Sequence, residues 1–134
     1  MKKYFVAYRF TGEDPDVLHD RMSTVVDSLK KVGIDGFCNL FDEKEYQKSK
    51  FGAKEIMDIA FNKIDNSEGV FVIIASDDKS EGLLMEIGYA YAKKKHIIVA
   101  VHEDATTYAP SIGNQSIVWK DNKDLASKIE AMKL

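Results

Sequence analysis

The sequence has 134 residues, of which 45% are hydrophobic and 31% are charged. This composition is typical of a globular domain and excludes disordered and fibrous chains. The longest apolar run, Gly69 to Ala75, has only seven residues and is too short to span a bilayer. We therefore expect a single domain over residues 1–134 without a membrane partner.

The charge balance and the cysteine content narrow the function further. A formal net charge of −3 and a pI near 5.6 argue against a nucleic-acid polymer as partner, although they allow a small anion at a local site. Residues 1–6 enter a strand-like run and lack the long apolar segment of a signal peptide. A lone cysteine, Cys38, forms neither an internal disulfide nor a zinc cluster. These features predict a cytoplasmic protein.

The apolar residues of the first half predict two strands around a helix. Tyr4–Tyr8 is a short apolar run that ends in a polar loop, which is typical of a strand. Over residues 16–32 an apolar residue recurs every three or four positions, which predicts a helix. Pro15 just before this segment and Gly33 just after it are typical of a helix start and a helix end. Ile34–Cys38 predicts the second strand. Residues 39–52 are polar and are expected to be irregular.

The second half repeats the alternation of helices and strands. We expect helices at residues 56–64, 81–94 and 125–132, and strands at Gly69–Ala75, His96–Val101 and Ser116–Trp119. Five strands that alternate with helices predict an α/β fold. We expect a three-layer flavodoxin-like or Rossmann-like domain with a five-stranded parallel sheet in the order 2-1-3-4-5. Ligands of such sheets bind beyond the carboxyl ends of the strands.

The most informative segment, residues 76–92, follows the third strand. Ser80 stands at the N-cap of the next helix, and Gly82 lies in its first turn. Free N–H groups, a hydroxyl and a glycine at a helix start suit a bound phosphate. An ordinary helix cap with a surface glycine explains the same two residues without any ligand.

Glu86 is the candidate catalytic group of this helix. Its neighbours at three and four residues are small or apolar, so the carboxyl group is paired, solvated at the helix edge or held at a raised pKa. Six residues of helix rise roughly 9 Å, which is the order of the distance from a 5′-phosphate across a pentose to C1′. The spacing therefore suits a phosphate at Ser80 and Gly82 with Glu86 acting at C1′.

The pattern Ser80-x-Gly82-x-x-x-Glu86, followed by Ile-Gly-Tyr-Ala and a lysine-led strand, resembles the nucleoside 2-deoxyribosyltransferase family. It looks most like the 2′-deoxynucleoside 5′-monophosphate N-hydrolase branch. The resemblance implies that Glu86 attacks C1′ as the nucleophile and releases the base. Ser80 is expected to bind the 5′-phosphate, because the transferases have aspartate there and take nucleosides. Water is the favoured acceptor, deoxyribosyl transfer remains open, and neither a metal nor an organic cofactor is required.

The resemblance also assigns the loop after the first strand to the nucleotide site. Arg9 is expected to bind the phosphate, Tyr8 to line the sugar pocket as a catalytic residue, and Phe10 to contribute to binding. A surface ion pair of Arg9 with Glu13 or Asp14 is the alternative.

A second subunit is part of the same expectation. The family supplies a polar residue from a neighbouring subunit after the fourth strand, where Thr106 and Thr107 stand in this chain. The resemblance therefore implies a homodimer with shared sites that acts on a small nucleotide or nucleoside.

Two features keep other functions open. The family places an aspartate on the second helix where Ala60 stands, and Asp58, Asn62 and Asp65 are out of register. This departure favours a nucleotide-binding module without activity. Residues 5–9 also resemble the start of Toll/interleukin receptor (TIR) domains, whose enzymatic members would use the glutamate at Glu86 to cleave NAD.

Overall fold

The computed structural model describes the backbone of all 134 residues, and the side chains of all except residues 42–44 and 46. Five parallel strands form one sheet in the order β2-β1-β3-β4-β5. Their bounds are β1 (Lys2–Ala7), β2 (Ile34–Phe37), β3 (Gly69–Ile74), β4 (His96–His102) and β5 (Gln115–Trp119). The predicted α/β class, parallel pairing and strand order are confirmed.

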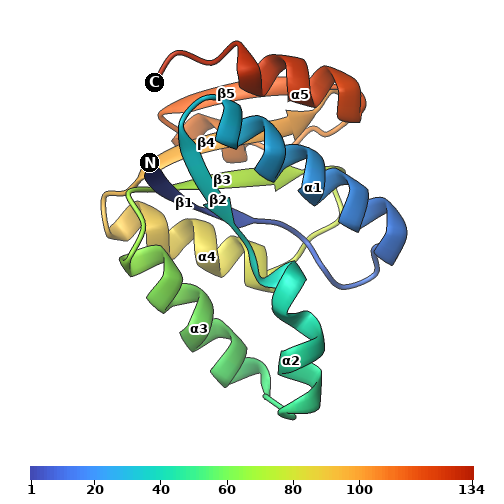
Figure 1. The fold of residues 1–134 in the computed structure, drawn as a ribbon, viewed down its shortest axis with the longest axis vertical. Helices are drawn as coiled ribbons and strands as arrows, with labels where there is room; N and C mark the ends of the chain where they lie inside the picture. Colours follow the sequence, from blue (N-terminus) through green and yellow to red (C-terminus); the bar gives the residue numbers. More distant parts are fainter.

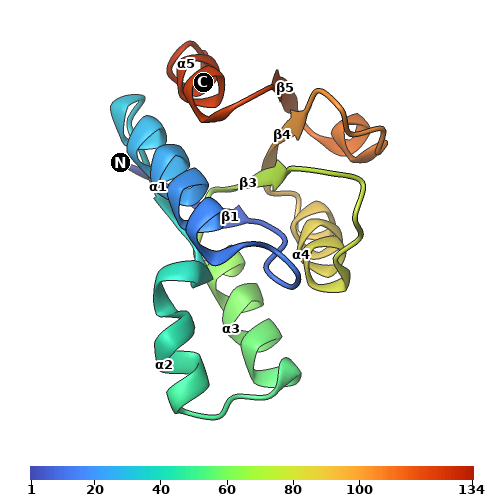
Figure 2. The ribbon, with the colours of Figure 1, turned by 90° about the vertical axis from the view of Figure 1, so that its right-hand side faces the viewer.

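Helices cover both faces of the sheet, as Figures 1 and 2 show. The pair α1 (Pro15–Lys31) and α5 (Asn122–Glu130) covers one face, and α3 (Ala53–Asp65) and α4 (Glu81–Ala92) cover the other. Three short helices complete the fold: η1 (Asn39–Asp42), α2 (Glu43–Lys48) and η2 (Ala109–Ile112).

The expectation that residues 39–52 are irregular was wrong, because this segment contains η1 and α2. The residue types of α2, which are mainly glutamate, lysine and glutamine, have high helix propensity. The sequence of α2 has no apolar residues that repeat at helical spacing, so the pattern of apolar residues could not predict this helix.

The core divides into two clusters, one on each face of the sheet. Along β1 the side chains alternate, so that Val6 joins the α1 and α5 cluster while Phe5 and Ala7 join the α3 and α4 cluster. Every residue of β3 is buried, as predicted for a central parallel strand. The carboxyl ends of the strands therefore meet between two packed layers.

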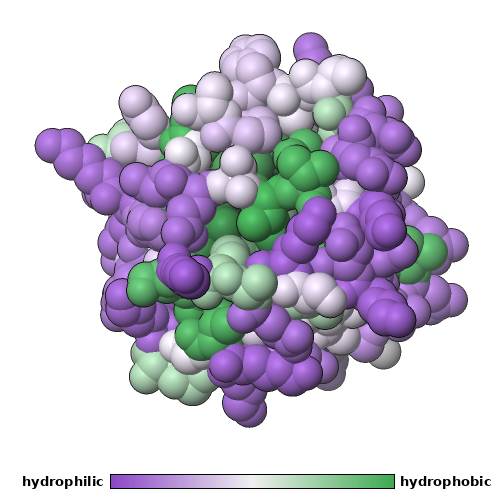
Figure 3. Space-filling model, turned by 90° about the horizontal axis from the view of Figure 1, so that it is seen from above, coloured by the Kyte–Doolittle hydropathy of each residue, from purple (hydrophilic) through white to green (hydrophobic). Residues whose placement is uncertain are grey.

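The surface is mainly polar with local apolar areas. Figure 3 views the molecule from above and shows an apolar band between hydrophilic side chains. Val118, on the edge strand β5, is one of the half-exposed apolar residues. Among the described residues, every helix falls short of the length and apolar character that a membrane span requires.

Gly69 at the start of β3 is expected to tolerate no side chain. A Cβ atom there would meet the ring of Tyr4 and lie 2.6 Å from the backbone oxygen of His96. The Tyr4 hydroxyl is itself hydrogen-bonded to the His96 ring at 2.9 Å, so the ring is not free to swing aside. We expect Gly69→Ala to lower the free energy of unfolding by about 2 kcal/mol. Urea denaturation measures this, and an unchanged midpoint would contradict the close approach.

Candidate active site

Helix α4 carries a carboxyl group in the stripe by which it packs on the sheet. Its four buried residues, Leu83, Glu86, Ile87 and Ala90, follow the spacing of one helix face. Glu86 is only 8% exposed. Among the side chains that the structure describes, none forms a hydrogen bond or ion pair with it, and burial raises the pKa of Glu86 to about 8. Of the three states that the sequence allowed, the structure therefore favours the raised pKa.

The start of α4 presents hydrogen-bond donors and an open backbone, as phosphate-binding helix N-termini do. The Ser80 hydroxyl oxygen accepts a hydrogen bond from the Leu83 backbone N–H at 3.2 Å and keeps its own hydrogen to donate. A Cβ atom on Gly82 would have the Met57 sulfur at 3.7 Å as its nearest neighbour, so the backbone there is open. The first N–H groups of a helix have no partner within it. The Ser80 hydroxyl thus caps the helix and retains a hydrogen that it can donate to an anion.

Two aspartates after β3 tie together the loops at the carboxyl edge of the sheet. The Asp77 carboxylate accepts hydrogen bonds from the Thr106 backbone N–H at 2.7 Å and from its hydroxyl at 2.9 Å. These bonds hold the pKa of Asp77 below its usual value. Asp78 lies 3.6 Å from Arg9 in the loop after β1. Neither aspartate was predicted as a site residue, although two carboxyl groups shortly after a buried strand were a signal in the sequence.

Arg9 forms the surface ion pair that was the alternative to phosphate binding. Its guanidinium lies 3.0 Å from Glu13 and 3.6 Å from Asp78, while Asp14 caps α1 instead. Gly12, at a φ of +83°, would bring a Cβ atom within 2.9 Å of the Arg9 guanidinium. The positive φ favours glycine at this position, and a side chain there would also displace the end of the flexible Arg9 side chain.

The other three predicted site residues are Tyr8, Phe10 and Thr107. None of them has a contact with α4 among the interactions described below. Tyr8 is half-buried and packs against the cluster under α1 and α5, on the face opposite α4. Phe10 is exposed. The Thr107 hydroxyl accepts a hydrogen bond from the Ala109 N–H at 3.2 Å.

The position of the missing aspartate belongs to the core. Ala60 is fully buried with Ile64 and Ile87 in the cluster under α3 and α4. Asp58 pairs at 2.7 Å with the exposed Lys54, one turn earlier in α3. The backbone and side-chain oxygens of Asn62 accept hydrogen bonds from the side-chain amide of Asn66. These polar side chains are thus engaged on the surface of α3.

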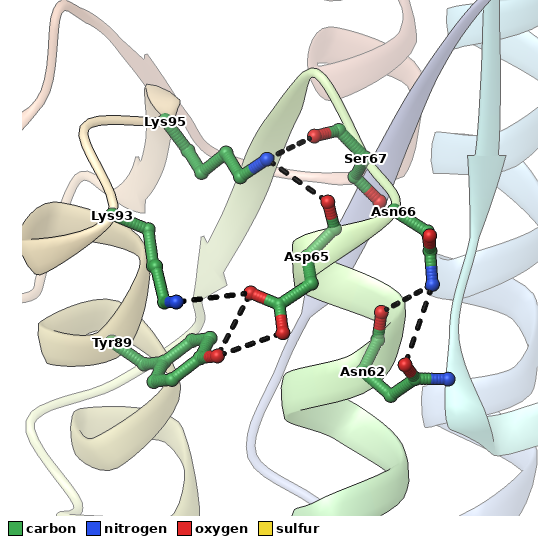
Figure 4. A network of polar contacts seen from close by, with 7 residues as sticks. All are labelled: Asn62, Asp65, Asn66, Ser67, Tyr89, Lys93 and Lys95. Carbon is green, nitrogen blue, oxygen red and sulfur yellow. Dashed lines mark hydrogen bonds and ion pairs between the residues drawn. The ribbon is translucent and has the colours of Figure 1, made fainter.

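Asp65 forms a polar network at the far end of α3 and α4 (Figure 4). Its two carboxylate oxygens accept hydrogen bonds from the Tyr89 hydroxyl at 2.8 and 2.9 Å, and one of them lies 3.8 Å from the Lys93 ammonium nitrogen. Lys95 donates to its backbone oxygen at 3.1 Å. The carboxylate raises the pKa of the Tyr89 phenol through their hydrogen bond. Asp65 therefore fastens α3 to α4 and is not a partner of Glu86.

Two surface hollows of the structure lie away from Ser80 and Glu86. They have volumes of about 490 and 500 Å³ and lie at the amino edge of the sheet, beside Gly33 and Glu68 and beside Lys95 and Asn114. The ligand edge of a parallel α/β sheet is the opposite one, where the loops described above meet. Among the described side chains, no three histidines, cysteines or acidic residues are grouped as metal ligands.

Several solved structures share this fold. The CMP N-glycosidase BcmB of Clostridium botulinum superposes with a TM-score of 0.71 and 17% identity over 98% of this chain and 100% of its own. A conserved protein of Enterococcus faecalis V583 gives a TM-score of 0.68 and 15% identity over 97% and 98%. A 2-deoxyribosyltransferase of Bacillus psychrosaccharolyticus gives 0.66 and 18% over 98% and 93%. At these identities the likeness establishes the fold.

The sequence itself identifies the family. No curated protein sequence matches this chain. The family model for nucleoside 2-deoxyribosyltransferases, by contrast, matches residues 7–130 and so includes β2, β3, β4 and β5 in full and the last residue of β1. With the fold and the helix that carries Ser80 and Glu86, this match shows that the chain belongs to the nucleoside 2-deoxyribosyltransferase family, a family of enzymes.

Proposed function

We propose that this protein cleaves the N-glycosidic bond of a nucleoside 5′-monophosphate, with Glu86 as nucleophile and water as acceptor. Its family supports cleavage or transfer at a glycosidic bond. The observation that carries the proposal is the unpaired, buried carboxyl group of Glu86. Glu86 lies six residues after Ser80, the N-cap of α4, which corresponds to roughly 9 Å of rise along the helix.

The reaction proceeds in two displacements. A carboxylate oxygen of Glu86 bonds to C1′ while the bond from C1′ to the base breaks, and its electron pair leaves with the base. Water then attacks C1′, the carboxylate leaves, and a proton is released. Each transition state resembles an oxocarbenium ion, which an adjacent carboxylate stabilises. Because Ala60 carries no acid, the base takes its proton from water.

The helix start supports a phosphate-bearing substrate. The Ser80 hydroxyl and the N–H groups of the first turn are donors, and the open backbone at Gly82 allows an anion to approach. One protein of similar fold is named for the glycosidic cleavage of CMP, which is itself a nucleoside monophosphate. Both observations favour a nucleotide over a free nucleoside.

We also propose that the enzyme acts as a homodimer with shared sites. The loop after β4 is held in place, since Asp77 binds Thr106 at two atoms. The Thr107 hydroxyl accepts one hydrogen bond from its own chain and keeps its hydrogen to donate. A fixed loop with a free hydroxyl hydrogen suits a residue that reaches a neighbouring site.

Ser80→Asp is expected to separate phosphate binding from helix capping. Aspartate caps a helix as well as serine does, so α4 should keep its start. The added negative charge repels a 5′-phosphate, and we expect kcat/KM for a monophosphate to fall at least about tenfold while the matching nucleoside is unaffected. Chromatography of the released base measures both. Ser127→Asp on the exposed face of α5 is the control. An equal loss on both substrates would contradict a phosphate seat at Ser80.

A further inference from the structure

Glu86 is the only acidic side chain that is buried among the residues the structure describes. The other buried polar residues of that set are Ser28, Asn39 and Ser67. The core cluster under α3 and α4, beside which Glu86 lies on its helix, has only apolar members. Enzymes that cleave glycosidic bonds normally use two carboxyl groups, one at the anomeric carbon and one that protonates the leaving group. The described core supplies only the first of these.

Three acidic groups in the loops at the carboxyl edge of the sheet have no proton to donate. Hydrogen bonds from Thr106 hold the pKa of Asp77 below its usual value. Glu13 and Asp78 lie 3.0 and 3.6 Å from the Arg9 guanidinium. The adjacent cation keeps both carboxylates ionised. These three groups are therefore anions and cannot act as general acids.

The histidine and tyrosine side chains that flank this region are engaged elsewhere. Both ring nitrogens of His102 have hydrogen-bond partners in the backbone, at 3.0 and 3.1 Å. Tyr8 packs under α1 and α5, on the face opposite Glu86. The Tyr89 hydroxyl donates to Asp65 at the far end of α4, and this hydrogen bond raises the pKa of the phenol. None of these groups is placed to protonate a base that leaves C1′ at Glu86.

The loops at the same edge carry an excess of negative charge. We call residues 8–14, 75–80, 103–108 and 120–121, which follow β1, β3, β4 and β5, the acidic edge. Its seven acidic and three basic residues are Glu13, Asp14, Asp77, Asp78, Glu103, Asp104 and Asp121, and Arg9, Lys79 and Lys120. Seven negative and three positive charges give the acidic edge a formal charge of −4, whereas the whole chain carries −3. Such a field favours a ligand that contains a positive group.

We propose that the substrate is a nucleoside 5′-monophosphate whose base carries a positive charge, such as an N-alkylated base or a pyridinium. The proposal rests on the proposed function and specifies the leaving group of that reaction. A cationic base needs no proton in order to leave, and its charge is the one that the acidic edge attracts. The start of α4 at Ser80 binds the phosphate, as proposed above.

The first displacement is balanced without an acid. A carboxylate oxygen of Glu86 bonds to C1′, and the bond from C1′ to the ring nitrogen breaks. The electron pair of the broken bond stays on the ring and cancels its positive charge, so the base leaves as a neutral molecule. Water then attacks C1′, the carboxylate leaves, and the proton of this water is released. A neutral base follows the same path more slowly, because it must take a proton from water.

Two matched pairs of substrates test the charge of the leaving base. Nicotinamide mononucleotide has a cationic pyridinium ring, and its dihydro form has a neutral ring of nearly the same size. 3-Methylcytidine 5′-monophosphate has a cationic ring at pH 7.5, whereas CMP is neutral in its base. Each substrate is prepared with ribose and with deoxyribose, and base release at pH 7.5 is measured by chromatography and corrected for release without enzyme.

We expect kcat/KM to be at least about a hundredfold higher for the cationic member of each pair. A positioned acid contributes roughly a hundredfold to ten-thousandfold to such a reaction, and only the neutral base needs one. Most of the difference should appear in kcat, since the missing acid acts on bond cleavage. Glu86→Gln should release base from neither member, while Glu81→Gln, with its substitution at an exposed glutamate of the same helix, should keep the wild-type preference.

The outcomes separate this proposal from the proposed function. Values of kcat/KM within about tenfold in both pairs would overturn the cationic base and leave the function standing. A preference in one pair alone would show recognition of that base rather than of its charge, and a difference confined to KM would show that a proton donor is present. Either result overturns the proposal. Release from none of the monophosphates would overturn the proposed function itself.

Discussion

Glu86→Gln is expected to abolish base release and to make the protein more stable at pH 7. Without a carboxylate, no bond to C1′ forms, so we expect activity to fall by at least about a thousandfold. Glutamine resembles the protonated acid in shape but never ionises inside the core. We expect the free energy of unfolding to rise on the order of 3 kcal/mol, or roughly 10 °C in Tm.

The sign of the stability change follows from the pKa shift. Burial raises the pKa of Glu86 from 4.5 to about 8, so the folded state holds a proton that the unfolded chain releases. This contribution is fully present below pH 4.5 and is lost between about pH 4.5 and 8, by about 1.4 kcal/mol per pH unit. The advantage of Glu86→Gln should therefore be small at pH 4.5 and largest above pH 8.

Thermal unfolding at pH 4.5, 7 and 8.5 measures this difference. Glu81→Gln is the matched control, because Glu81 is an exposed glutamate of the same helix. It should change Tm little at each pH. If Glu86→Gln is less stable than the wild type at pH 8.5, the carboxyl group has a partner that stabilises its ionised form, and the account of an isolated acid is wrong.

The rate of base release is expected to rise with pH up to about pH 8. Only the carboxylate is a nucleophile, and a pKa of about 8 leaves roughly a tenth of Glu86 ionised at pH 7. We expect kcat/KM to fall about tenfold per pH unit below 8 and to be level above it. A glutamate with an ordinary pKa would give a flat profile over the same range.

The profile is best measured from pH 6.5 to 9.5. A phosphate monoester has its second pKa near 6, so the substrate stays a dianion over most of this range. A rate that is constant from pH 6.5 to 9.5 would show that Glu86 is ionised throughout, and would contradict the raised pKa.

The fold could be predicted because its signals are local. The apolar run at Gly69–Ala75 corresponds to β3, and the period of threes and fours over residues 16–32 corresponds to α1. Helix α2 escaped prediction because it has no apolar period, only residues with high helix propensity.

The candidate site was predictable along one helix but not between loops. Ser80 and Glu86 share α4, so their spacing follows from the sequence. The bond between Asp77 and Thr106 joins residues 29 apart in the chain, and only the tertiary structure brings them together. Likewise, Tyr8 follows β1 as expected but packs toward α1 and α5, since side chains alternate between the two faces.

Base release from a panel of substrates tests the central claim most directly. The panel contains deoxyribonucleoside and ribonucleoside monophosphates, the matching nucleosides and NAD, each incubated with wild type and Glu86→Gln at pH 8.5 and analysed by chromatography. We predict free base from monophosphates with the wild type and none with the variant. Full release by Glu86→Gln would contradict the nucleophile, nicotinamide release from NAD alone would indicate a TIR-like activity, and no release from any substrate would indicate a binding module.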